Sequence, residues 1–237
     1  MADITKGSQV VVYYDETKDI KGSDLKAHVL LFVPTRLHVS QQTSLFGPWD
    51  DYLEPANEFY AQMKAIRDKY NCYGKLHFTD ISGQRWNKYD LAYYEIVSLA
   101  VNAMRTRGPH HPLTYPLHFK LAVMFYPKNA DLNMYGGNSK KEKGLRHDET
   151  VLRILLKGAS HYLYSEGHTV EVLRIICDGD PQHRPFSEER ILWQLLAEEE
   201  RGRTPLRDYV SIGEGAAIEH LDSDHKKHDV DSDAYKH

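Results

Sequence analysis

The sequence VVVYYDET, residues 10–17, carries the clearest structural signal in this chain. Its first five residues are β-branched or aromatic and apolar at every position, which is typical of a strand buried on both faces of a sheet. The strand is expected to end at the acidic pair Asp15-Glu16. We therefore expect an α/β domain whose first strand brings two carboxylates to one edge of a sheet.

Further apolar stretches predict the rest of this sheet. Residues 28–33 predict a second strand ended by Pro34, and the short connection favours an antiparallel hairpin. Residues 117–126 predict a third strand. Residues 170–177 predict a fourth, deep in the sheet because its centre is apolar on both faces, and residues 209–212 a short fifth strand.

Helical spacing of apolar residues and capping signals predict the helices. Asp148 is expected to cap one of them, and the polar residues 129–146 before it indicate a mobile loop. The first two predicted helices form a helical insertion, residues 54–108, after the second strand. The predicted helices are 54–70, 89–107, 149–165 and one that Ser187 caps and Gly202 ends.

This order of elements indicates a single α/β domain over residues 1–237. Without the insertion, three early strands are followed by helix–strand alternation, which suits a mixed sheet flanked by helices. A ribonuclease-H-like arrangement is one such fold. Residues 219–237 are polar and predict a partly disordered C-terminal segment.

Composition narrows the class of protein. There are 30 Lys and Arg residues against 34 Asp and Glu, a formal charge of −4, which argues against nonspecific coating of nucleic acid but allows a local basic groove. The two cysteines, Cys72 and Cys177, are far apart and fit a reducing compartment. No apolar run approaches the roughly 20 residues that span a bilayer, and the polar N-terminus shows no signal peptide. We expect a soluble, cytoplasmic protein without a membrane role.

Asp15 and Asp178 both follow apolar strands, and in a mixed sheet such strand ends can lie side by side. Two nearby carboxylates repel each other, and a bound cation offsets this repulsion. Mg²⁺ prefers oxygen ligands, and two such ions about 4 Å apart could activate water and stabilise the leaving oxygen in phosphodiester cleavage. The alternative is a plain turn, because Asp bonds readily to its own backbone; Asp178-Gly179-Asp180 favours this reading slightly.

Two weaker groups could also bind metal. His77 belongs to a short predicted edge strand, residues 75–78, and Asp80 follows it. Their odd spacing places them on opposite sides of a strand, so an exposed or hydrogen-bonded His is favoured. Residues 229–233 resemble the start of a calcium loop, yet Ala234 stands where Gly is required. A solvated segment is the favoured interpretation there.

One basic cluster could contact nucleic acid. It comprises Lys140, Lys141, Lys143 and Arg146, close to Gly136-Gly137. Such a cluster could follow a phosphate backbone, although most runs of this kind are solvated loops.

Several of these segments resemble the domain-of-unknown-function 3800 family. Residues 10–17 resemble its opening Asp-Glu-Ser motif, with Thr17 in place of Ser, and residues 75–78 resemble its His-containing strand. Asp178 and Leu221-Asp222-Ser223 also stand where the family leads one to expect them. The resemblance implies a ribonuclease-H-like fold and a suspected nuclease that uses Mg²⁺ or Mn²⁺. It implies catalytic Asp15, Glu16 and Asp178, with Asp15 and Asp178 as metal ligands and His77 as a weaker one.

One family feature is missing. A closing Gln-x-x-Asp helix would be expected just after residues 233–237, and Gln194 is followed by Ala197 where the Asp should stand. The resemblance therefore implies a truncated chain or a form that lacks one metal ligand, which can leave the present chain inactive.

Three hypotheses follow. The first is a divalent-metal-dependent nuclease or related phosphodiesterase. The second is a noncatalytic module on the same fold that binds nucleic acid or protein through the Lys140–Arg146 segment. The third is a fragment that completes its sheet with another chain. The sequence leaves the substrate (DNA, RNA or nucleotide) and the oligomeric state open.

Overall fold

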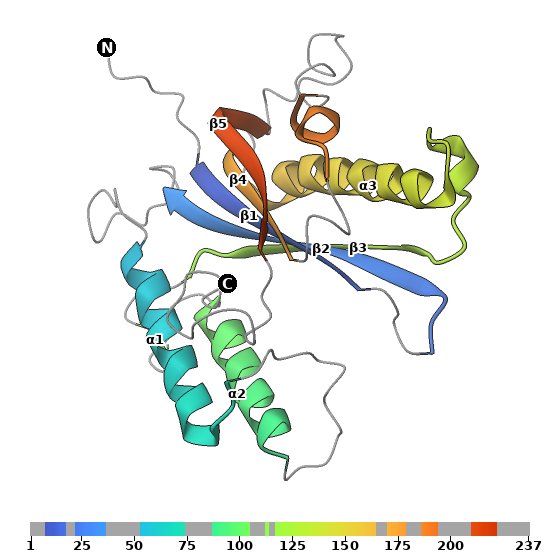
Figure 1. Cartoon of the computed structure of the whole chain (residues 1–237). Coiled ribbons are helices and arrows are strands. Elements are labelled where there is room, and N and C mark those ends of the chain that lie inside the picture. The colour runs from blue at the N-terminus through green and yellow to red at the C-terminus, as the bar shows by residue number, and fades with distance from the viewer. Residues whose placement is uncertain are drawn as a thin grey trace, which may run out of the picture. The chain divides into compact units, whose positions relative to one another are not determined.

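The computed structural model describes residues 8–17, 22–36, 53–73, 87–104, 112–113, 117–164, 170–178, 186–193 and 210–221. The chain divides into two compact units (Figure 1). The first comprises residues 1–50 and 119–221, and the second comprises residues 51–118 and 222–237. Each unit is described by itself.

The first unit is built on a mixed sheet of five described strands in the order β3-β2-β1-β4-β5. β1 is antiparallel to β2, and β2 is antiparallel to β3. β4 runs parallel to β1, and β5 runs parallel to β4. The predicted α/β class with a mixed sheet is therefore confirmed. The strands are β1 (Ser8–Thr17), β2 (Leu25–Arg36), β3 (Lys120–Pro127), β4 (Val170–Asp178) and β5 (Val210–Leu221).

β1 lies in the middle of this sheet, between β2 and β4, which explains why Val10 and Val12 have no exposed surface. The β1–β2 hairpin pairs Glu16 directly with His28. β2 continues beyond Pro34, which was expected to end it. A register shift between Gln9 and Val10 accommodates the proline, since bulges are where a sheet tolerates a residue that cannot donate.

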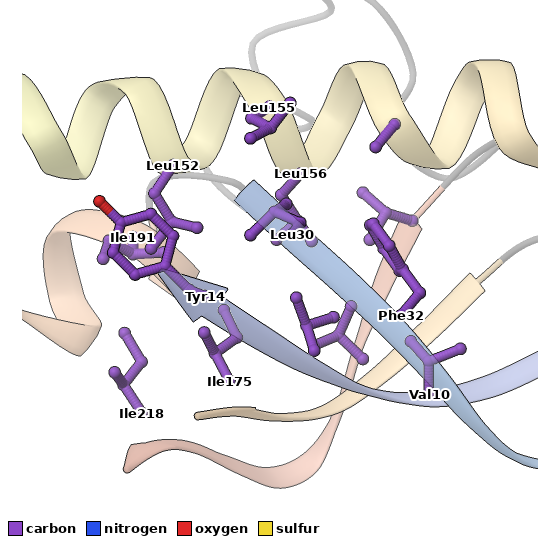
Figure 2. Packing of buried hydrophobic residues seen from close by; sticks show 14 of the residues in the cluster. Val10, Tyr14, Leu30, Phe32, Leu152, Leu155, Leu156, Ile175, Ile191 and Ile218 are labelled. Carbon is purple, nitrogen blue, oxygen red and sulfur yellow. The ribbon is translucent and has the colours of Figure 1, made fainter. Parts of the chain in front are cut away.

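One long helix, α3 (Lys140–Leu163), packs on a face of the sheet. Figure 2 shows Leu152 and Leu156 of this helix close to Tyr14 and Leu30 of the strands. This cluster is the core of the first unit. Burying each large aliphatic side chain in it contributes about 1.5–3 kcal/mol, which holds the helix to the strands. Its other buried members include Val10, Val12, Phe32, Leu155, Val172, Ile175 and Ile191.

α3 begins well before the helix that the sequence predicted. Residues 129–146 were expected to form a loop, but residues 132–134 form a short 3₁₀ helix and α3 starts at Lys140. Ser139 caps it: its Oγ accepts a hydrogen bond from the Glu142 amide at 3.1 Å, and Glu142 Oε2 accepts one from the Asn138 amide at 2.8 Å. This reciprocal arrangement is close to a capping box. Asp148, expected as the cap, is instead buried inside the helix.

β5 is longer than predicted, and the helix expected after Ser187 is described only as far as Trp193. Ser187 accepts a hydrogen bond from the Arg190 amide, as expected of a cap, and a π-helical segment, Glu189–Trp193, follows. β5 reaches Leu221, far beyond the predicted residues 209–212. A register shift opposite Val172 and a positive φ of 75° at Gly215 allow this long strand to stay paired with β4.

The second unit contains α1 (Leu53–Tyr70) and α2 (Lys88–Ala103), which correspond to the helices expected in the insertion. Lys69 Nζ and Tyr70 OH at the end of α1 both donate to Glu95 Oε1 on α2, at 2.6 Å each. These bonds hold the pKa of Glu95 below its ordinary value. In the ranges described above, no helix is both long enough and apolar enough to cross a membrane.

Candidate metal centre

Asp15 and Asp178, the two expected metal ligands, are exposed at the ends of β1 and β4. They directly follow Tyr14 and Cys177, which are paired with each other and buried in the core. Because side chains alternate along a strand, both acids point to the face away from α3. Asp15 Oδ1 also accepts a hydrogen bond from the Glu16 amide at 2.8 Å, the local bond on which the turn interpretation was based.

Glu16 lies on the other face of β1, the face that α3 covers. It is half-buried and sits directly opposite His28 of β2, which has no exposed surface. Asp148 is 8% exposed and belongs to α3, the helix that covers this face of the sheet. One possible ligand atom from each of these three side chains lies within 4.8 Å of the other two. We call Glu16, His28 and Asp148, which could hold a metal ion, the candidate metal centre, shortened below to the metal centre.

The imidazole of His28 is oriented by a hydrogen bond at one nitrogen. Nδ1 lies 2.6 Å from the hydroxyl of Tyr14, whereas Nε2 makes no hydrogen bond within the described residues and lies 3.8 Å from Asp148 Oδ1. When Nδ1–H donates to the Tyr14 oxygen, the lone pair of Nε2 faces the carboxylate side, which is the tautomer that binds a cation. A hydrogen bond at the second nitrogen is the usual way in which proteins orient a histidine ligand.

Aromatic rings enclose the centre. Tyr126 packs against both His28 and His147, with ring centroids 4.8 Å apart in each pair. Tyr135 packs on His147 at the same distance, and His147 Nδ1 lies 3.1 Å from Asp148 Oδ1. These rings cover His28 and His147, which are both buried, so charges beside the two imidazoles interact more strongly than at an open surface.

These residues fit a divalent cation. Two carboxylates and an imidazole are ordinary ligands for Mn²⁺ or Zn²⁺, and three protein ligands leave positions for water or substrate. Without a cation, Glu16 and Asp148 are two carboxylates in close proximity, which a positive charge would stabilise. The group could therefore hold a metal ion.

The sequence pattern indicates Glu16 as a catalytic residue, not as a metal ligand, and it singles out neither of the other two for a site. His28 begins a predicted apolar strand, and Asp148 is a predicted helix cap. A signal for Asp148 was present: it is four residues before Leu152 and seven before Leu155, on the apolar stripe of the helix. A carboxylate in an apolar stripe needs a partner beneath it.

A cavity of about 520 Å³ borders the centre. His147 and Asp148 form part of its wall, and four lysines line it as well. These are Lys26, Lys128, Lys140 and Lys141.

The structure separates the members of the predicted basic cluster. Lys140 and Lys141 are exposed and line the cavity. Lys143 donates to Asn133 Oδ1 at 3.1 Å, and Arg146 is paired with Glu142 at 2.7 Å. Arg146 also packs so closely on Gly136 that a Cβ there would lie 2.5 Å from its guanidinium nitrogen. Lys143 and Arg146 therefore have structural contacts of their own.

Several predicted site residues lie outside the described residues. They are His77, Asp80, Asp180 and the acidic and histidine-containing segment 222–237.

Comparison with protein-family models, with curated proteins and with solved structures finds no match for this chain.

Proposed function

We propose that this chain is a divalent-metal-dependent nuclease or phosphodiesterase whose metal ligands are Glu16, His28 and Asp148. The observation that carries the proposal is the convergence of these side chains from β1, β2 and α3 to within 4.8 Å. Residues that are distant in sequence meet beside a lysine-lined cavity, with His28 and Asp148 buried and Glu16 half-buried. Phosphate esters are the substrates that such a combination of metal ligands and cations suits best.

The topology supports the more specific proposal of a ribonuclease-H-like fold and of membership in the domain-of-unknown-function 3800 family. Three antiparallel strands come first, and helix–strand alternation follows, with β4 and β5 parallel to β1. Glu16, from the segment that resembles the family's opening motif, is a member of the metal centre.

A divalent cation bound here would activate water and offset the negative charge that develops on the phosphate oxygens. Residues of the chain would orient the ligands and attract the substrate. Tyr14 orients His28, His147 contacts Asp148, and the lysines attract the anionic substrate. We propose Mn²⁺ ahead of Mg²⁺, because an imidazole nitrogen suits Mn²⁺ better than the harder Mg²⁺.

Cleavage of labelled DNA and RNA strands with Mn²⁺ tests the proposal. Asp148→Asn and His28→Gln are expected to lower the rate by more than about 100-fold, since even loss of an outer partner of a metal ligand costs 10–100-fold. Asp131→Asn, on an exposed carboxylate that caps the short 3₁₀ helix, is the control and should stay within about 3-fold. Cleavage that persists in chelator, or in both site variants, would refute the mechanism.

The face opposite α3 is tested in the same assay. Asp15→Asn and Asp178→Asn remove the charges of the two exposed strand-end acids while keeping their shape. If these variants lost activity and Asp148→Asn kept it, the metal would have to bind at the strand ends instead. Nucleic-acid binding that is insensitive to chelator, without any cleavage, would favour the noncatalytic module.

A further inference from the structure

The cavity beside the metal centre is built from three separate segments of the first unit. Lys26 comes from β2, Lys128 follows β3, and Lys140 and Lys141 belong to the first turn of α3. Asp148 belongs both to this wall and to the metal centre. A ligand in the cavity would therefore lie next to the proposed site of reaction.

The cavity is positively charged in a chain that is negative overall. Its lining carries four lysines against two carboxylates, Glu142 and Asp148, whereas the whole chain has a formal charge of −4. Glu142 is already held by the Asn138 amide and by Arg146, which together keep its pKa below the ordinary value. A concave surface lined by one sign of charge concentrates the field and attracts a ligand of the opposite sign.

The size of the cavity indicates what kind of anion it takes. About 520 Å³ lies within the range of roughly 300–1,000 Å³ found for small-molecule sites, so the cavity has room for one nucleotide. A strand passing across a surface would meet charges spread along a groove, whereas these lysines line one cavity. A terminal phosphate monoester carries about −1.5 to −2 near neutral pH, more than an internal diester, and lysine binds such a group as a point charge.

We propose that the lysine cavity binds the terminal phosphate of a nucleotide or of a nucleic-acid strand and so presents the neighbouring ester to the metal centre. This inference rests on the proposed function and specifies its substrate class. The expected substrates are nucleotides and the ends of nucleic-acid strands, and internal sites of a long strand are not expected as substrates.

Fluorescence anisotropy with internally labelled oligothymidylates tests the proposal. The probes carry a 5′-phosphate, a 3′-phosphate or hydroxyls at both ends, and the buffer contains chelator so that nothing is cleaved. One of the phosphorylated probes is expected to bind at least about tenfold more tightly than the hydroxyl probe. The double variant Lys140→Gln/Lys141→Gln should lose this preference, as should Lys26→Gln.

Lys143→Gln is the matched control, because it removes the same charge from the same helix turn at a residue that donates to Asn133 and does not line the cavity. It should keep the preference for the phosphorylated probe. Equal binding of all probes, or an equal loss in Lys143→Gln, would overturn the proposal. Unlabelled thymidine monophosphate distinguishes the sources: effective competition identifies free nucleotides as ligands, and weak competition identifies strand ends.

This assay can fail separately from the proposed function. If the preference is absent while Asp148→Asn abolishes Mn²⁺-dependent cleavage, the metal centre stands and the cavity proposal falls. If the preference is present while cleavage never depends on Asp148, the cavity binds phosphate and the catalytic proposal falls.

Discussion

Replacing Asp148 by Asn should abolish metal binding while leaving the fold intact. The side chain is 8% exposed and has almost the same shape as Asn, so the packing beneath α3 is kept. What changes is the charge near His28 Nε2, at 3.8 Å, and near His147 Nδ1, at 3.1 Å. The variant therefore tests the electrostatics of the site.

The expected effect on the metal-free protein is small because two contributions oppose each other. The chosen oxygens of Glu16 and Asp148 lie within 4.8 Å of each other, and at this limit, with an effective dielectric constant of about 20, their charges repel by roughly 3.5 kcal/mol. Glu16 is only half-buried, so solvent reduces this to about 1 kcal/mol. Losing the charge-assisted contact with His147 costs a similar amount. The free energy of unfolding should change by less than about 1 kcal/mol, which moves the Tm by about 2–4 °C at most.

Metal binding should separate the Tm of the unsubstituted protein from that of Asp148→Asn by a larger amount. At a Mn²⁺ concentration about 100 times the Kd, binding stabilises the folded state by about 2.7 kcal/mol. In a chain of this length each kcal/mol raises the Tm by about 2–4 °C, so the unsubstituted protein should gain about 5–11 °C. Asp148→Asn should gain almost nothing.

Thermal unfolding, followed by fluorescence or calorimetry, measures the Tm of the metal-free protein and its rise on metal binding. Mn²⁺ is added to chelator-treated protein. Glu16→Gln and His28→Gln should lose the metal-dependent rise as well. Asp15→Asn is the matched control: it lies on the opposite face, and its Oδ1 can still accept from the Glu16 amide. The reasoning is refuted if Asp15→Asn loses the rise and Asp148→Asn keeps it.

Two further predictions concern stability and thiol reactivity. Glu149 is 2% exposed and accepts hydrogen bonds from Arg190 and from the Ser187 amide. Arg190→Met should therefore cost about 2–4 kcal/mol in urea unfolding, somewhat less than loss of a fully buried pair, because the Arg190 side chain is 37% exposed. Replacing Glu149 by Met as well should recover part of this loss, and a single-variant cost below about 0.5 kcal/mol would contradict the account. Burial raises the pKa of the Cys177 thiol from 9.0 to about 12 and also raises the pKa of the Cys72 thiol. The folded protein should therefore react with a disulfide reagent far more slowly than the unfolded protein, and the absorbance of the released thiol would measure both rates. The Cys177 contribution to stability should be complete below pH 9.0 and should fall as the pH rises towards about 12; fast labelling of the native protein would contradict this.

Local sequence patterns were sufficient to predict the class of the fold. The run of β-branched and aromatic residues from Val10 to Tyr14 can be buried on both faces only inside a sheet, and β1 does lie between two neighbours. The helices were predicted for a similar reason, since spacing alone shows which residues share a face. The start of α3 was not predicted, because the polar composition of residues 129–146 and the Gly136-Gly137 pair indicated a loop, although Ser139 and Glu142 form a capping signal.

The candidate site could not be predicted in the same way. Asp15 and Glu16 are adjacent in sequence and both carry a carboxyl group, yet they point to opposite faces of β1 because side chains alternate along a strand. Which of the two meets other ligands depends on which face α3 covers, and that choice is made by packing between distant residues. The same packing brings Asp148 to His28 and Glu16, so the acidic pair could be located from local chemistry, whereas its partners emerge only when the helix lies on the sheet.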